Sequence, residues 1–239
     1  MDLLLASELS PETLAALQEH IQTQQDQQDS AVAEDFRLSQ FWYDDRTGRA
    51  LAQEAIDQSR EKRIAFVSTP AAYRDFIKIQ RENSDSPING DNVYLFEYDR
   101  RFDKMYNGHF VFYDYNEPTN LPEKFHNFFD YVLVDPPYLN TNCMEKFAET
   151  MRWLSKNVEV VTGKKDKILN PCTFITARML RKAIYTELGF KPSGFIPTFE
   201  SKLSNQFLTY TNYRSDRFGE CLEDLSESDD ESELVAQIS

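Results

Sequence analysis

Short apolar runs alternate with amphipathic stretches along the middle of the chain. Runs of apolar and β-branched residues predict buried strands at residues 64–69, 93–96, 109–113 and 131–134, with a fifth strand within residues 167–176. Apolar residues at helical spacing predict helices at residues 47–59, 71–79, 121–129, 141–156 and 178–188. Such alternation of strands and helices is typical of a mostly parallel sheet that is covered by helices.

The regions on either side follow other patterns. Ser10 and Pro11 predict the start of a helix, which a Gln-rich linker follows. Two aromatic-rich runs at residues 194–199 and 206–213 predict an antiparallel hairpin that closes the sheet. We interpret the cluster Phe41-Trp42-Tyr43 as a core or lid anchor rather than a substrate contact, because large aromatic side chains are mostly packing residues.

The strand at residues 131–134 ends in Asp135-Pro136-Pro137-Tyr138. Proline has no N–H for a strand ladder, so Asp135 and the proline carbonyls are left as acceptors beside the Tyr138 ring. In open α/β sheets, ligands bind beyond the carboxyl ends of the strands. These acceptors suit the methylation of an amine, since they take its hydrogens and the carboxylate stabilises the charge that grows on nitrogen. Tyr138 suits either stacking on a planar base or holding a lysine ammonium.

The same tetrapeptide is also an ordinary rigid turn, because Asp and Pro are common turn residues. The apolar strand before it and the acids after two upstream strands favour a functional site instead. Glu97 or Asp99 follows the second strand, and Asp114 follows the third. An acid after the second strand is suited to accept from ribose hydroxyls, and one after the third is suited to accept from an adenine amino group.

The charge of the chain is concentrated at its ends. The net charge is -14, but residues 1–36 and 220–239 each hold eight acids and no Lys or Arg, so residues 37–219 are close to neutral at +2. We therefore divide the chain into an acidic N-terminal helix with its linker at 1–36, a catalytic domain at 37–219 and an acidic disordered tail at 220–239. A near-neutral domain lacks the basic footprint that duplex DNA requires, and this argues against nucleic acid as a partner.

The scattered cysteines Cys143, Cys172 and Cys221 predict neither a disulfide framework nor a metal site. The N-terminus has no basic region and only a short apolar run, so we expect no signal peptide and no membrane span. A cytoplasmic monomer is the expectation.

Several longer motifs resemble those of one family. They are Leu38-Ser-Gln-Phe-Trp-Tyr-Asp44, Phe96-Glu-Tyr-Asp-Arg-Arg-Phe102, Tyr113-Asp-Tyr-Asn116, Val134-Asp-Pro-Pro-Tyr138, Leu203-Ser-Asn-Gln-Phe207 and Thr211-Asn-Tyr213. Together they resemble the eukaryotic elongation factor 1-alpha lysine methyltransferases, a group of class I S-adenosylmethionine-dependent enzymes that was first grouped with N6-adenine DNA methyltransferases.

The resemblance implies an α/β fold with a seven-stranded Rossmann-like sheet, mostly parallel with a C-terminal antiparallel hairpin. It implies S-adenosylmethionine as cofactor and translation elongation factor 1-alpha as protein substrate. The implied cofactor-binding residues are Ser68, Thr69, Pro70, Glu97, Asp99 and Asp114, and the implied catalytic residues are Asp135, Pro136, Pro137 and Tyr138. The sequence departs from the usual class I pattern after the first strand, where Ser68-Thr69-Pro70-Ala71-Ala72 stands in place of a glycine-rich motif.

Two alternatives stay open on the residues themselves. An N6-adenine methyltransferase would use the same acceptors, with Tyr138 stacked on a flipped base. A non-catalytic binding module would keep the fold without the cofactor. The primary hypothesis is methyl transfer to a lysine ε-amine, with Asp135 as orienter and charge stabiliser and with no obvious general base.

Overall fold

The sheet forms the centre of the molecule in the computed structural model, which describes residues 34–38, 40–82, 90–203 and 205–221. Its strands in spatial order are β3 (Phe110–Phe112), β2 (Val93–Glu97), β1 (Ile64–Val67), β4 (Tyr131–Val134), β7 (Cys172–Ala177), β9 (Phe207–Thr211) and β8 (Lys191–Pro192). The pairs from β3 to β7 are parallel, whereas β9 is antiparallel to both of its neighbours. The predicted fold class is confirmed.

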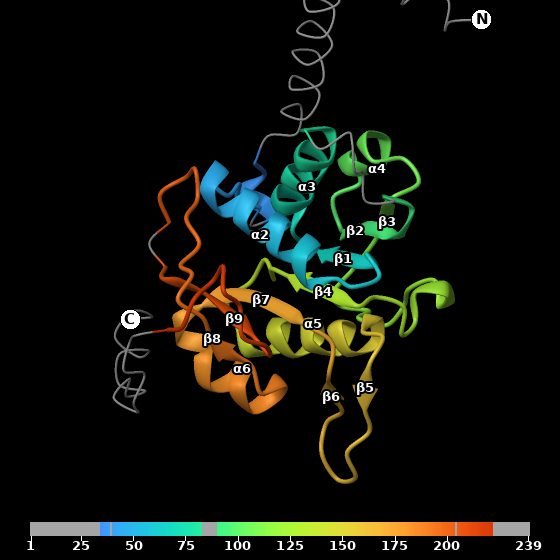
Figure 1. The fold of residues 1–239 in the computed structure, drawn as a ribbon, viewed down its shortest axis with the longest axis vertical. Helices are drawn as coiled ribbons and strands as arrows, with labels where there is room; N and C mark the ends of the chain where they lie inside the picture. Colours follow the sequence, from blue (N-terminus) through green and yellow to red (C-terminus); the bar gives the residue numbers. More distant parts are fainter. Residues whose placement is uncertain (1–33, 39, 83–89, 204, 222–239) are drawn as a thin grey trace, which may run out of the picture.

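Helices cover both faces of the sheet (Figure 1). On one face lie α2 (Asp45–Gln58) and α3 (Pro70–Glu82), and on the other lie α5 (Thr141–Leu154) and α6 (Arg181–Leu188). The short α4 (Arg101–Met105) follows β2. Alternate residues of β1 and β4 enter two separate cores, so that Phe66 and Leu133 pack on one side and Val67 and Val134 on the other. This two-sided burial explains why the central strands read as continuous apolar runs.

The strand register places three strand ends in one row. Val67 is level with Phe96 of β2 and with Val134 of β4. The next residue of each strand is therefore Ser68, Glu97 or Asp135, and all three stand side by side at the carboxyl edge.

One helix prediction is wrong. Residues 121–129 form only a 3-10 turn, η3 (Glu123–Phe125), and the chain then reverses through Asn127, whose φ is +53°. Phe125 and Phe129 leave the helical path because they are buried in an aromatic cluster against Phe96. Packing of these rings outweighs the helical spacing that the sequence displayed.

The predicted fifth strand divides in two. Asn170 and Pro171 separate β7 from the short β6 (Lys167–Ile168), which pairs outside the main sheet with β5 (Val158–Glu159). This break arises because Pro171 has no N–H for a ladder. The β5–β6 hairpin projects from the body of the molecule (Figure 1).

The C-terminal hairpin is confirmed only in part. Its second strand is β9, but its first is Lys191–Pro192 rather than residues 194–199. Residues 194–199 instead cross toward α2, where Phe199 forms an isolated antiparallel bridge with Tyr43. The predicted helix after Ser10 lies outside the described residues, as does nearly all of the acidic tail. Within the described residues, no helix combines the length and apolar character that crossing a membrane requires.

Candidate functional site

A cavity of about 760 Å³ opens at the carboxyl edge of the sheet. It collects residues from the ends of β1, β2, β3 and β4, together with the segments around residues 38–43 and 199–207. Nine of the ten site residues expected from the sequence line it: Ser68, Thr69, Pro70, Glu97, Asp114, Asp135, Pro136, Pro137 and Tyr138. Asp99 is the exception.

All four residues of the turn after β4 line this cavity. The backbone N–H of Asp135 still donates to the Val67 carbonyl, at 3.2 Å, and the two prolines then end the ladder. Tyr138 is 40% exposed and meets Tyr115 edge to face, with 5.8 Å between ring centroids. Asn140 caps α5 by accepting from the Cys143 N–H, which anchors the turn to the following helix.

The turn after β1 keeps a glycine-like shape without glycine. Ser68 has a φ of +52°, in the left-handed region that favours glycine. Pro70 then begins α3, where its fixed φ and missing N–H suit the first helical position. Thr69 lines the cavity, and its hydroxyl oxygen is buried without a hydrogen-bond partner.

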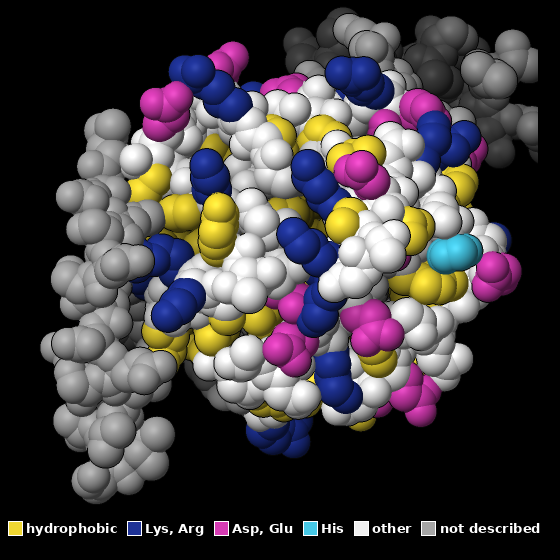
Figure 2. All heavy atoms as spheres, turned by 90° about the horizontal axis from the view of Figure 1, so that it is seen from below, with side chains coloured by type: hydrophobic (Ala, Val, Ile, Leu, Met, Phe, Trp, Pro, Cys, Tyr) yellow, Lys and Arg dark blue, Asp and Glu magenta, His cyan; other side chains and the backbone are white. Residues whose placement is uncertain are grey.

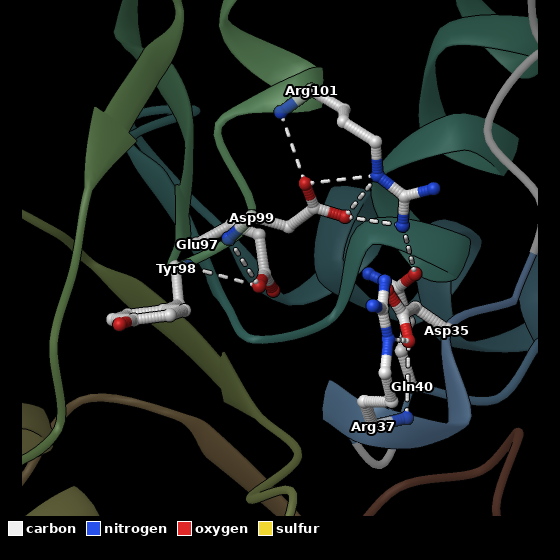
Figure 3. A network of polar contacts seen from close by, with 7 residues as sticks. All are labelled: Asp35, Arg37, Gln40, Glu97, Tyr98, Asp99 and Arg101. Atoms are coloured by element: carbon white, nitrogen blue, oxygen red, sulfur yellow. Dashed lines mark hydrogen bonds and ion pairs between the residues drawn. The ribbon is translucent and has the colours of Figure 1, made fainter.

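Glu97 and Asp99 have different surroundings, which Figure 3 shows. Oε1 of the buried Glu97 accepts from the backbone N–H groups of Tyr98 and Asp99, at 2.9 and 3.1 Å. The Asp99 carboxylate forms an ion pair with Arg101 at 2.6 Å. Asp99 therefore braces the loop, while Glu97 lines the cavity.

Burial raises the pKa of both carboxyl groups that stand in the row. It raises the pKa of Asp135 to about 7, against a hydrogen bond from the Tyr43 hydroxyl that lowers it, and the nearby Glu97 adds to the rise. It also raises the pKa of Glu97 to about 7, which backbone donation by Asp99 opposes. Two acids that titrate near neutral pH in one cavity are typical of a functional site.

Asp114 lies at the far side of the cavity, after β3. Its Oδ1 accepts from the backbone and side-chain N–H groups of Asn116, at 2.9 and 3.0 Å. These bonds orient the carboxylate at the strand end. Among the described residues, no group of three His, Cys, Asp or Glu side chains is arranged to hold a metal ion.

Two of the cavity residues that were not among the expected site residues carry informative polar groups. Gln40 is buried there; its Oε1 accepts from Arg101 at 3.3 Å, while its Nε2 has no hydrogen-bond partner (Figure 3). Tyr43 is buried as the anchor interpretation expects, yet its hydroxyl reaches Asp135. The motif at residues 38–44 was a signal for both, but nothing in it indicated which side chains face the cavity.

Comparisons with known proteins agree with this arrangement. A family model described as "Probable N6-adenine methyltransferase" matches residues 34–215. "EEF1A lysine methyltransferase 1" of Mus musculus is 40% identical over 220 residues, covering 87% of this chain and 92% of that protein. Its Homo sapiens counterpart is 38% identical over 220 residues, with the same coverage of both chains.

A fungal relative is more distant. "Protein-lysine N-methyltransferase EFM5" of Saccharomyces cerevisiae is 34% identical over 185 residues, covering 75% of this chain and 72% of that protein. Residues 34–215, which the family model matches, contain all the residues that line the cavity. The chain therefore belongs to the methyltransferase family that this model describes, and the relatives of the chain named above are lysine methyltransferases.

Proposed function

We propose that the protein transfers a methyl group from S-adenosylmethionine to the ε-amine of a lysine on translation elongation factor 1-alpha. The observation that carries the proposal is the row of Ser68, Glu97 and Asp135, which places in one cavity the strand ends that would hold the cofactor and the turn that would bind the amine. The names of the relatives support the choice of substrate. We also propose a cytoplasmic location for the protein.

The cavity suits a nucleoside cofactor of this kind. Its volume of about 760 Å³ lies within the range of small-molecule sites. Thr69 Oγ1 and Gln40 Nε2 are buried polar atoms without a protein partner, and such atoms are costly unless a ligand or water satisfies them. When bound, S-adenosylmethionine supplies an electrophilic methyl group on a sulfonium.

Each strand end would hold one part of the cofactor. Glu97 uses Oε1 for backbone N–H groups, so Oε2 is available to ribose hydroxyls. Asp114 would accept from the adenine amino group, and the 52%-exposed Tyr98 ring would stack on the base. Residues 68–70, with Gln40, would contact the methionine end.

The turn after β4 would bind the amine. Asp135 and the Pro136 carbonyl accept the amine hydrogens, which aims the nitrogen lone pair at the methyl group. Pro137 stiffens the turn, and the exposed face of Tyr138 holds the incoming ammonium by a cation-π contact. The Asp135 carboxylate stabilises the positive charge that grows during transfer.

The substrate must lose a proton before it attacks. A free lysine has a pKa of about 10.4, so desolvation in the cavity has to favour its neutral form. Asp135 stabilises the developing charge only when ionised. Because burial raises its pKa to about 7, turnover should rise with pH through the neutral range.

The nucleic-acid alternative requires basic residues along a strand path. Among the described residues that line the cavity, the acids are Glu97, Asp114 and Asp135, and the only base is Lys202. On the face seen in Figure 2, Lys and Arg are interspersed with Asp and Glu. The mostly acidic charge of the cavity lining favours a protein substrate.

The test offers purified elongation factor 1-alpha, single-stranded DNA and RNA separately to the enzyme with methyl-labelled S-adenosylmethionine. We expect label on the protein alone, with a mass increase equal to one CH₂ for each methyl group transferred, and the label should be recovered as N-methyllysine after acid hydrolysis. Calorimetry with S-adenosylmethionine distinguishes a catalyst from a binding module. Label on nucleic acid alone, or no cofactor binding, would contradict the proposal.

A further inference from the structure

Tyr43 reaches the proposed amine site from a distant part of the chain. It precedes α2, its side chain is 1% exposed, and its hydroxyl donates to Oδ2 of Asp135, 92 residues later. The Tyr43 ring packs against Phe199, with 5.1 Å between centroids. A buried tyrosine needs a partner for its hydroxyl, and here that partner is the central carboxylate of the cavity.

A pair of segments fixes the position of this ring. We call residues 42–47 and 198–200 the clasp, because hydrogen bonds join them beside the cavity. The Asp44 N–H donates to the Thr198 carbonyl at 3.1 Å, and the Glu200 N–H donates to the Trp42 carbonyl at 2.9 Å. The Thr198 N–H donates to Thr47 Oγ1 at 3.0 Å. The bonds of the clasp fix the backbone before and after Tyr43, so the Tyr43 hydroxyl is held in position toward Asp135.

Asp135 depends on this donor. Among the described residues, the Tyr43 hydroxyl is the one side chain that donates to the Asp135 carboxylate. Burial raises the pKa of Asp135, Glu97 raises it further, and the Tyr43 hydrogen bond opposes both. The other titratable groups that line the same cavity are Tyr98, Tyr113, Asp114, Tyr115, Tyr138 and Lys202.

We propose that Tyr43 is a positioning residue for methyl transfer: its hydroxyl holds Oδ2 of Asp135, which favours the ionised form of the carboxylate and turns Oδ1 toward the substrate amine. This inference rests on the proposed function. It also gives the clasp a role in catalysis, because the two segments carry the donor that orients Asp135.

The experiment compares wild type with Tyr43→Phe, which keeps the ring against Phe199 and removes only the hydroxyl. We expect kcat at pH 7 to fall by about tenfold, since hydrogen bonds to charged groups are worth about one pKa unit or more. The acid limb of the kcat profile should move to higher pH, so that activity recovers at pH 9. KM for S-adenosylmethionine should change by less than about twofold.

Tyr131→Phe is the matched control. Its hydroxyl is also buried and bonds to Thr173 Oγ1 at 2.7 Å and to the Tyr213 hydroxyl at 3.1 Å, away from the cavity. We expect its pH profile to match that of wild type. A second variant, Phe199→Leu, loosens the ring without touching the hydroxyl and should move the acid limb in the same direction by a smaller amount.

Two results would overturn the inference. One is a Tyr43→Phe enzyme with unchanged kcat and pH profile. The other is a uniform loss of kcat at every pH together with a raised KM for the cofactor, which would show that Tyr43 only shapes the cavity. If Tyr43→Phe does not fold, the profile of Phe199→Leu decides.

A separate readout distinguishes this inference from the proposed function. The Asp135 carboxyl is titrated by NMR in protein labelled with ¹³C-aspartate, with Asp135→Asn to assign its signal. Tyr43→Phe should raise this pKa. If wild type does not methylate elongation factor 1-alpha, the proposed function fails, while the titration still supports or refutes the Tyr43 contact.

Discussion

One aspartate precedes β4 and another follows it, and the two carboxylates differ in the number and kind of their hydrogen-bond donors. Asp130, at the amino end, accepts from the Ser59 hydroxyl at 2.6 Å and from the backbone N–H groups of Glu61 and Arg63. Asp135, at the carboxyl end, accepts from the side chain of Tyr43. The first carboxylate accepts three hydrogen bonds from its own protein, whereas the second accepts one from a side chain and keeps acceptor capacity for a ligand.

The difference shows how one residue type serves structure or chemistry. Three donors compensate the burial of Asp130. Their hydrogen bonds also stabilise the turn before β1, where Lys62 has a φ of +57°. With fewer donors, burial raises the pKa of Asp135 to about 7. At the end of the strand that faces the cavity, Asp135 therefore lowers the stability of the fold but provides a reactive acceptor.

The largest expected effect is on turnover. Asp135→Asn keeps the shape of the turn but removes the charge that would stabilise the transition state, so we expect kcat to fall by about 10²–10³-fold. Rates of methyl transfer to elongation factor 1-alpha measure it. Asp130→Asn serves as the control at the other end of the strand, and an equal loss of kcat in that variant would erase the functional distinction between the two ends.

Of substitutions at the two ends of β4, Asp130→Ala should lower the stability of the fold more. It leaves two backbone N–H groups and the Ser59 hydroxyl without their acceptor, and we expect the free energy of unfolding to fall by about 3 kcal/mol. Urea denaturation measures the change. Stability within about 0.5 kcal/mol of wild type would show that water replaces Asp130 at little cost.

The pH dependence of stability should separate the two aspartates further. The pKa of Asp135 rises from 3.8 in the unfolded chain to about 7 in the folded protein. Below pH 4 the group is protonated in both states and does not lower the free energy of unfolding. Its destabilising effect then grows as the pH rises to 7. Asp135→Asn should therefore stabilise the protein at pH 8, by about 1–3 kcal/mol, and by much less at pH 5. Denaturation curves at both values test this, and the same gain at both would mean that titration is not its cause.

The smallest expected effect concerns Gln40, at the edge of the same cavity. Gln40→Ala removes an unpartnered buried Nε2, and we expect the Kd for S-adenosylmethionine to rise by about fivefold through the loss of one hydrogen bond. Calorimetry measures it. Gln53→Ala, on the exposed surface of α2 where Gln53 bonds to Asp57, should leave the Kd as in wild type; a parallel change in both variants would count against a contact with the cofactor.

Much of the site could be predicted because strand ends are local features. The apolar run of β4 followed by Asp135 and two prolines leaves few backbone alternatives, and acids after β2 and β3 share its edge in any parallel sheet. The sequence did not distinguish Glu97 from Asp99. Their separation depends on Arg101, which pairs with Asp99 and leaves Glu97 to the cavity.

The errors share a physical cause. Residues 121–129 show helical spacing, but their aromatic side chains pack against Phe96 of a neighbouring strand. Residues 194–199 have strand-like composition, but they reach back to the segment before α2. In each case a contact between distant segments outweighed a local preference.

The sequence by itself determined which runs are buried and where β4 must stop, because side-chain burial and the missing N–H of proline act on adjacent residues. Only the tertiary structure decided which acids meet in one cavity and which hydroxyl faces Asp135. Strand register and the clasp depend on the packing of segments far apart in the chain, and a hydrogen bond across 92 residues leaves no periodic signal in the sequence.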